Sequence, residues 1–179
     1  MPTVYLALGT NLGDRADNLR RALAALRDHF NLESVSPVYE TEPAYVLDQP
    51  RFYNLACRAG TSLSARETLS QLKHLEAELG RQPTIRFGPR LIDLDLLLYD
   101  SLSLDSPDLT LPHPRLHERA FVLIPLADIA PDIVHPVLGL SIKQLLDQLS
   151  DDEKRKVWRA DKIDSVPSAD EKVPPCTKH

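Results

Sequence analysis

The sequence is poor in the features that mark several large classes of protein. It has only two cysteines, Cys57 and Cys176, and their wide separation argues against a disulfide framework or a cysteine zinc site. No run approaches the roughly 20 apolar residues of a membrane-spanning helix. Residues 1–14 lack the basic, apolar and cleavage regions of a signal peptide. We therefore expect a cytoplasmic protein with no membrane partner.

Lysine is also scarce over most of the chain. Residues 1–150 contain twelve arginines and two lysines, whereas residues 151–179 balance seven acidic against seven basic side chains. The net charge of −5 therefore comes from the first segment, and it argues against a general nucleic-acid binder. A bias toward arginine is ordinary in some genomes, but the planar guanidinium also suits carboxylates and phosphates.

The overall composition of the chain is that of a globular domain. The residues are 42% apolar and 26% charged, as in ordinary globular proteins. The length of 179 residues fits one domain with a short additional segment. Periodicity predicts strands over 3–8, 33–40, 52–60 and 91–99, and helices over 16–29 and from the capping box at Ser64 to Gly80. This β-α-β-β-α-β order predicts an α+β fold, a ferredoxin-like antiparallel sheet with two helices on one face. Additional helices are expected near 115–129 and over 141–149.

The chain divides into a body, residues 1–150, and a charged tail, residues 151–179. The tail is rich in charge and proline, so we expect it to be mostly disordered beyond about residue 160. Trp158 is its only large aromatic residue and a candidate for docking its start onto the body. We expect a monomer.

Paired carboxylates on one strand are the strongest chemical signal. Because strand side chains alternate, Asp93 and Asp95 point to one face, while the even-numbered apolar residues from Ile92 to Leu98 point to the core. Such a pair, roughly 6–7 Å apart at Cα, can hold Mg²⁺ together with substrate phosphates. An ordinary solvated face is less favoured, because aspartate is a poor strand former and like charges repel.

Each side of this pair carries charge of one sign only. Residues 81–92 contain Arg81, Arg86 and Arg90 and no acid, and residues 93–108 contain five aspartates and no base. A metal–polyphosphate site needs this pattern, because arginines neutralise phosphates while carboxylates hold the metal. For any single arginine, a solvated loop with ordinary ion pairs is the alternative.

His113 and His117 are four residues apart, the spacing of a metal pair on a helix. Pro114 makes His113 non-helical or a helix start, and zinc would need a third ligand. A phosphate contact from His113, with Arg119 nearby, is the better functional interpretation, and a surface histidine explains the pattern equally well. The glycines of G-T-N-L-G-D form neither G-x-G-x-x-G nor a Walker motif.

Five ordered blocks carry a resemblance to a known family. They are G-T-N-L-G-D, Y-E-T-E-P ahead of D-Q-P-R-F-Y-N, E-x-E-L-G-R, R-F-G-P-R-L-I-D-L-D-L-L, and L-P-H-P-R-L-H-E-R-A-F. They occur in this order along the chain, and the resemblance extends over roughly residues 3–150. In these blocks the sequence resembles the 6-hydroxymethyl-7,8-dihydropterin pyrophosphokinase family of folate biosynthesis, whose fold is ferredoxin-like with extra helices.

The resemblance implies that pyrophosphate passes from the co-substrate ATP to the hydroxymethyl oxygen of 6-hydroxymethyl-7,8-dihydropterin, giving AMP and the pterin diphosphate. Asp93 and Asp95 would hold two Mg²⁺ ions, and Arg81 and Arg90 would stabilise the transferring group. The ATP-binding residues carried over are Glu76, Arg86, Leu96, Thr110, His113 and Arg119, with Leu96 and Thr110 against the nucleoside. The pterin-binding residues are Thr41, Phe52, Asn54, Phe87 and Phe121.

Two loops, residues 42–51 and 81–90, would close over the substrates and exclude water. The second loop departs from the family pattern. Phe87 stands where members often carry tryptophan, and Pro83 where a second basic residue is common. Beyond this loop, Asp108 stands where some members have arginine. A family member of weakened activity is therefore one alternative.

Two other function classes fit parts of the pattern. Ferredoxin-like domains with paired aspartates also serve nucleotidyl transfer, but such enzymes need no pocket built from Phe52, Asn54 and Phe121. A non-catalytic RNA-binding module of the same fold is opposed by the net charge and by the absence of an RNP-like aromatic motif.

Overall fold

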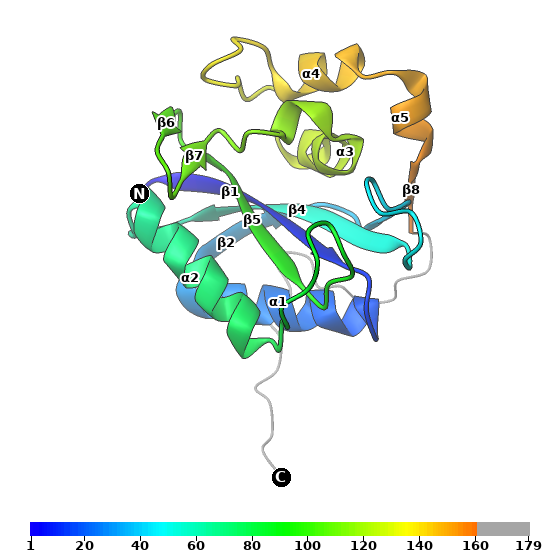
Figure 1. Ribbon diagram of the computed structural model, residues 1–179. Helices are drawn as coiled ribbons and strands as arrows, with labels where there is room; N and C mark the ends of the chain where they lie inside the picture. Colours follow the sequence, from blue (N-terminus) through cyan, green and yellow to red (C-terminus); the bar gives the residue numbers. More distant parts are fainter. Residues whose placement is uncertain (161–179) are drawn as a thin grey trace.

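A computed structural model describes residues 1–160, and an antiparallel sheet forms its centre (Figure 1). The strand order is β5-β1-β4-β3-β8, and β2 also pairs with β4. The strands are β1 (Thr3–Thr10), β2 (Asn31–Val35), β3 (Tyr39–Thr41), β4 (Phe52–Gly60), β5 (Asp93–Tyr99) and β8 (Val157–Arg159). A separate ladder joins β6 (Leu104–Asp105) to β7 (Thr110–Leu111).

Helices α1 (Arg15–His29) and α2 (Ala65–Glu78) cover one face of the sheet, as the sequence predicts. The predicted capping box opens α2: Ser64 and Glu67 exchange side-chain and backbone hydrogen bonds. The apolar stripes of both helices pack on strand residues in one continuous core. Its fully buried leucines include Leu6, Leu8, Leu19, Leu23, Leu55, Leu72, Leu75 and Leu94.

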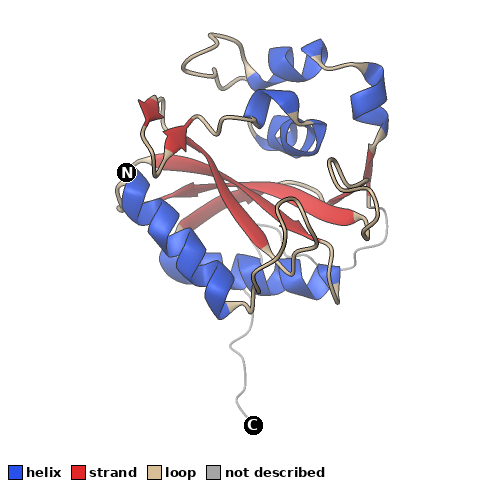
Figure 2. Cartoon of the chain, in the orientation of Figure 1, coloured by secondary structure: helices blue, strands red, loops and turns tan. Residues whose placement is uncertain are grey.

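The opposite face is covered by α3 (Ala120–Ile129) and α4 (Ile142–Gln148), which follow the short 3-10 helix η1 (Leu116–Glu118). Figure 2 shows this second layer of helices across the sheet from α1 and α2. The sequence of α3 is apolar on nearly all sides because the helix lies between the sheet and α4. Ser141 caps α4 as predicted. The sheet is therefore buried on both faces.

The alternation expected along β5 breaks near its end. Leu94 and Leu96 join the core under α1 and α2, but Leu98 lies with Leu97 in the core under α3. The cause is a register shift: Tyr5 pairs with Leu98 while Leu6 pairs with Leu96, so Leu97 is an extra residue. The prediction of a single apolar row from Ile92 to Leu98 is therefore wrong at Leu98.

The strand expected over residues 33–40 is two strands, β2 and β3, which both pair with β4. Between them Ser36 bonds to Ala56 twice: its N–H donates to the Ala56 carbonyl at 2.8 Å, and its side-chain hydroxyl accepts the Ala56 N–H at 2.9 Å. Pro37 follows at this break, where its missing N–H does no harm to the ladder.

The folded part of the chain runs past the tail boundary at residue 150. Residues 151–155 form α5 (Asp151–Arg155), and β8 pairs with β3 at the edge of the sheet. The expectation of disorder beyond residue 160 falls on residues outside the described part, as does Cys176. Within residues 1–160, no helix is both long and apolar enough to cross a membrane.

Candidate active site

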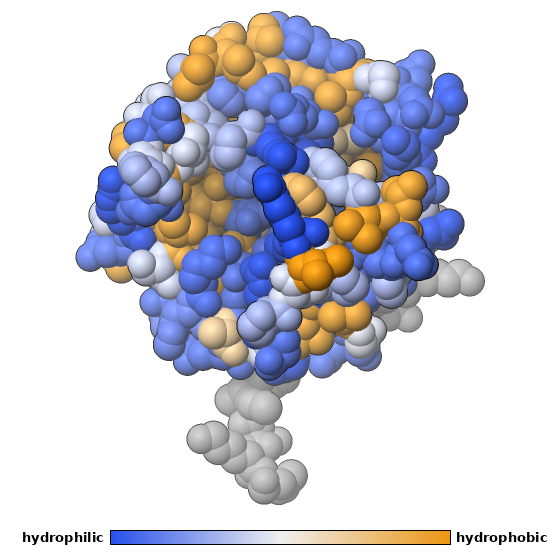
Figure 3. Space-filling view, in the orientation of Figure 1, coloured by the Kyte–Doolittle hydropathy of each residue, from blue (hydrophilic) through white to orange (hydrophobic). Residues whose placement is uncertain are grey.

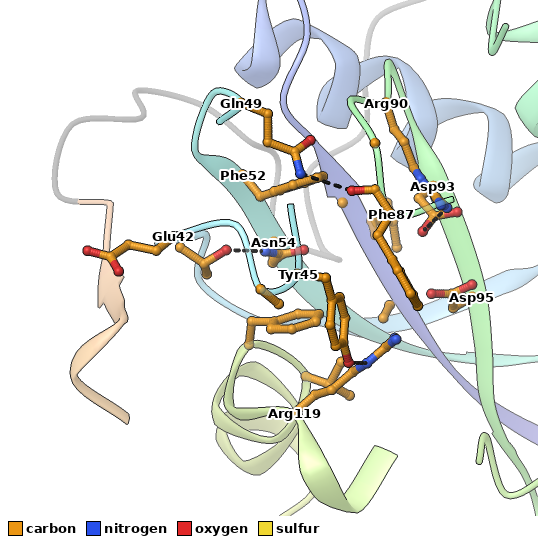
Figure 4. A pocket seen from close by; sticks show the side chains of 18 of the residues that line it. Glu42, Tyr45, Gln49, Phe52, Asn54, Phe87, Arg90, Asp93, Asp95 and Arg119 are labelled. Carbon is orange, nitrogen blue, oxygen red and sulfur yellow. Dashed lines mark hydrogen bonds and ion pairs between the residues drawn. The ribbon is translucent and has the colours of Figure 1, made fainter. Parts of the chain in front are cut away.

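A pocket of about 230 Å³ lies on the sheet face that α3 borders, at the ends of β1, β4 and β5. Figure 4 shows its side chains converging from the sheet, from α3 and from two loops. Ten of the residues predicted from the sequence line it: Thr41, Phe52, Asn54, Phe87, Arg90, Asp93, Asp95, His113, Arg119 and Phe121.

Gly9 lies at the centre of the pocket floor. In β1 it pairs with Asn54 on one side and with Asp93 on the other. A Cβ atom at Gly9 would lie 2.8 Å from the Asn54 Oδ1 atom, so only glycine leaves room for that amide. The Asn54 Nδ2 group donates a hydrogen bond of 2.8 Å to the Thr41 hydroxyl, which fixes the orientation of the amide in the pocket.

Asp93 is neutralised by two arginines. Arg81 Nη1 lies 2.8 Å from Asp93 Oδ1, and Arg90 Nη1 lies 3.2 Å from Asp93 Oδ2. Arg81 also lies 2.6 Å from Glu76, which is buried and accepts the Leu94 N–H at 2.7 Å. Glu76 thus ties α2 to the edge of β5 and holds Arg81 against Asp93.

Asp95, unlike Asp93, is not neutralised by an arginine. Among the described residues it has no cationic partner within 4.0 Å. Burial, together with the neighbouring Asp93 carboxylate, raises the pKa of Asp95 to about 7. A partly buried carboxylate without a cationic partner is costly for folding and is typical of a site that binds a cation.

His113 and Arg119 line the same pocket as these carboxylates. Burial, and then the positive charge of Arg119, lowers the pKa of His113 to about 4. The imidazole is therefore neutral near pH 7. Its Nδ1 atom accepts the Arg115 N–H at 3.2 Å, which leaves the Nε2 position to carry the proton and donate it to a ligand.

The two loops expected to close over the substrates meet above the pocket. Tyr45 from residues 42–51 and Phe87 from residues 81–90 have ring centroids 4.2 Å apart. Gln49 donates a hydrogen bond of 2.9 Å to the Phe87 carbonyl, and Arg119 Nε donates one of 3.4 Å to the Tyr45 hydroxyl. Figure 4 shows the two rings facing each other between Asn54 and Asp95.

The loop tips expose apolar side chains to solvent. Leu47 is 76% exposed and Ile85 is 66% exposed. On the face drawn in Figure 3, apolar areas lie beside strongly hydrophilic ones around the centre, where these loops run. Apolar tips of this kind are suited to loops that pack more tightly once a ligand is bound.

Five predicted residues do not line the pocket. Glu76 and Arg81 lie behind Asp93, and Arg86 is exposed beside the Phe87 ring. Thr110 lies in β7, half-buried.

The Leu96 side chain is only 4% exposed and packs in the core under α1 and α2, because side chains on β5 alternate. A contact between a nucleoside and the Leu96 side chain is therefore ruled out, and only its backbone is available.

Four contributors were missed by the sequence reasoning. Tyr45 and Gln49 lie in a proline-containing loop without periodicity. Arg115 lies in the segment 113–119, of which only His113, His117 and Arg119 were considered as functional residues. Asn11 holds both loops: its Nδ2 atom donates to the Pro50 carbonyl at 2.9 Å, and its Oδ1 atom accepts the Arg90 N–H at 2.7 Å. The block G-T-N-L-G-D was a signal for Asn11, but its role depends on tertiary contacts.

No group of three or more histidine, cysteine, aspartate or glutamate side chains within residues 1–160 could hold a metal by itself. The donor set of Asp93 and Asp95 nevertheless fits Mg²⁺, which prefers one or two protein carboxylates and takes its other ligands from phosphates and water. The unpartnered Asp95 carboxylate supports this fit.

Comparisons with known sequences agree with this geometry. The chain is 40% identical over 157 residues to the 2-amino-4-hydroxy-6-hydroxymethyldihydropteridine pyrophosphokinase of Bacillus subtilis, covering 87% of this chain and 89% of that protein. It is 42% identical over 142 residues to the folic acid synthesis protein FOL1 of Dictyostelium discoideum, covering 79% of this chain but 22% of that protein. This chain therefore spans about a fifth of the longer relative.

Solved structures share the fold. A structure described as HPPK-DHPS in complex with substrates superposes with a TM-score of 0.73 at 14% identity, covering 88% of this chain and 46% of that one. Wild-type HPPK-DHPS of Plasmodium falciparum with pteroate gives a TM-score of 0.72 at 16% identity, covering 88% and 47%. The sequence profile of one family matches residues 5–131. The chain belongs to the 7,8-dihydro-6-hydroxymethylpterin-pyrophosphokinase (HPPK) family.

Proposed function

We propose that this chain transfers pyrophosphate from ATP to the hydroxymethyl oxygen of 6-hydroxymethyl-7,8-dihydropterin, with release of AMP, in folate biosynthesis. The observation that carries the proposal is the composition of one small pocket. One end is lined by aromatic rings and an oriented amide, and the other end holds paired carboxylates with Arg90, His113 and Arg119.

The ring end of the pocket suits a flat heteroaromatic with polar edges. Phe52 and Phe121 supply apolar faces, and Phe87 is stacked on Tyr45 above them. The Asn54 side-chain amide, oriented by its hydrogen bond to Thr41, is available to the polar edge of a bound pterin ring. Stacking together with edge hydrogen bonds is what recognition of a pterin requires. A volume of about 230 Å³ suits one such ring system rather than a whole nucleotide.

The charged end suits the phosphates of ATP. Asp93 and Asp95 would hold Mg²⁺, with two ions expected, and the metal would neutralise phosphate charge there. Arg81 and Arg90 both lie within hydrogen-bonding reach of Asp93, so they are placed to turn toward a polyphosphate bound beside it. The neutral His113 can donate a hydrogen bond to a phosphate oxygen without adding charge, while Arg119 supplies the charge.

The nucleoside side would lie along the outer edge of β5. Backbone groups of alternate residues point to this edge in an antiparallel pair, and the Leu94 N–H already points there, to Glu76. The backbone of Leu96 therefore points the same way, toward β7, which carries Thr110. These groups would contact the nucleoside, and transfer would follow from positioning and electrostatics.

A coupled assay for AMP release tests the proposal. We expect AMP from ATP only when the reduced hydroxymethylpterin and Mg²⁺ are both present. Asp95→Ala should abolish turnover with the fold intact by circular dichroism, whereas Asp147→Ala, at an exposed position of α4, should leave turnover unchanged. AMP release that does not depend on the pterin would falsify the assignment.

A further inference from the structure

The face of the sheet opposite the pocket carries a row of three side chains. In the ladder, Glu40 of β3 pairs with Tyr53 of β4 on one side and with Trp158 of β8 on the other. Cross-strand partners share a face, so the three lie in one row, one residue out of phase with Thr41 and Asn54, which face the pocket. Trp158 therefore touches no ligand bound in the pocket.

Two arginines lie over this row. The Arg15 guanidinium is 3.7 Å from the centre of the Tyr53 ring and 3.2 Å from Glu40. The Arg51 guanidinium is 3.6 Å from Glu40 and 4.9 Å from the centre of the Trp158 ring. Arg15 also donates a hydrogen bond of 2.9 Å to the Arg51 carbonyl. Residue 51 is therefore held through both its side chain and its backbone.

Residues 156–158 contact both ends of the loop over residues 42–51. At the first end, the Lys156 carbonyl accepts the Glu42 N–H at 3.1 Å, and Val157 pairs with Thr41. At the second end, Trp158 lies beneath the Arg51 guanidinium. Between these ends lie Tyr45 and Gln49, which reach Phe87 across the pocket.

We propose that the C-terminal segment of residues 156–159 anchors this loop for pterin binding, and that Trp158 is a positioning residue for the pterin. The inference rests on the proposed function for the identity of the ligand. Fixing both ends of a ten-residue loop reduces the conformational freedom that must be lost when the loop orders over a substrate. The carboxylates Asp93 and Asp95 come from β5, and the loop reaches the phosphate-binding side of the pocket through the hydrogen bond from Arg119 to Tyr45, so the effect on the pterin should exceed the effect on ATP.

The test compares Trp158→Ala with Trp158→Phe and with the control Arg155→Ala, at an exposed position of α5. The alanine variant should raise the KM for the pterin by roughly three- to tenfold, the size expected for loss of one cation–π contact and its packing. The KM for ATP and kcat should stay within about twofold of wild type. Phenylalanine, which keeps an aromatic face under Arg51, should restore most of the pterin KM.

Hydrogen exchange of residues 42–51 gives a readout that needs no activity. The loop should exchange faster in Trp158→Ala than in wild type, Trp158→Phe or Arg155→Ala. An unchanged pterin KM, or an equal rise in both KM values, overturns the proposal. If the wild-type chain shows no pterin-dependent turnover, the proposed function fails, and the exchange rates alone decide whether Trp158 anchors the loop.

Discussion

Tyr45 and Phe87 stack with ring centroids 4.2 Å apart, and this contact joins two loops that are distant in the sequence. Arg115 lies 5.2 Å from the centre of the Tyr45 ring and 5.1 Å from that of Phe87, so one guanidinium contacts both rings. Phe87 has a φ of 60°, a backbone conformation that side chains rarely adopt, which indicates that its contacts hold it in place.

The stack should therefore act as one unit in substrate binding. Tyr45→Ala and Phe87→Ala should each raise the KM for the pterin, and the double variant should cost little more than either single one. The coupling energy from the double-mutant cycle should be about 0.5–1.5 kcal/mol, the usual value for an aromatic pair. Asp48→Ala, at an exposed position of the same loop, is the matched control. Strictly additive effects would mean that the rings act independently.

Asp95 should lower the stability of the metal-free protein at neutral and alkaline pH. Its pKa is about 7 in the folded chain, against about 3.9 for an unfolded aspartate, so the folded state binds the proton more tightly. Stability is then lost as pH rises from about 4 through 7. Asp95→Asn should raise the melting temperature at pH 8 by on the order of 5 °C, with almost no change at pH 4, while turnover is lost.

The measurement is thermal unfolding in the presence of a chelator at both pH values. Asp147→Asn, at an exposed position of α4, controls for the loss of a charge. A variant less stable than wild type at pH 8 would show that Asp95 makes a stabilising contact instead.

His113 should remain neutral over the whole range in which the protein is active. Its pKa in the folded chain is about 4, whereas an unfolded histidine titrates near 6.5, so the unfolded state binds a proton first as pH falls. Stability is then lost from about pH 6.5 toward pH 4. At pH 5 the loss relative to pH 7 is on the order of 2 kcal/mol, and His113→Gln should remove most of it.

Urea unfolding at pH 7 and pH 5 measures this difference, and His29→Gln, at the exposed end of α1, is the control. Nuclear magnetic resonance gives a direct check, because the His113 ring signals should not shift between pH 8 and pH 5. An inflection near pH 6.5 from these signals would contradict the buried, neutral imidazole.

The paired carboxylates of the site followed from simple alternation along the sequence. Asp93 and Asp95 share a face of β5, and Phe52 and Asn54 share a face of β4, so each strand delivers its pair to the same pocket. The shared face of Asp93 and Asp95 was predicted from alternation, because side-chain direction on a regular strand depends only on local geometry. Phe52 and Asn54 were carried over from the family resemblance. The capping box at Ser64 is local in the same sense.

The misses share a different cause. The extra residue at Leu97 turns the Leu98 side chain to the opposite face of the sheet. Docking of Trp158 onto the body was predicted and is confirmed, but strand β8 and its pairing with the distant strand β3 were not predicted. Tyr45 reaches the pocket only because Phe87, Gln49 and Asn11 hold the loop there. Each of these depends on contacts between distant residues, which leave no periodic signal in either segment.

The position of β5 at the end of the sheet has a consequence for solubility. An outermost strand with free N–H and C=O groups can recruit another chain and begin aggregation. Here Glu76 occupies the Leu94 N–H, and the His113 N–H occupies the Leu97 carbonyl at 2.9 Å. Residues proposed to bind ATP therefore also occupy hydrogen-bonding groups on the edge strand β5 and hinder its pairing with another chain. Substitutions at Glu76 should then lower solubility as well as turnover.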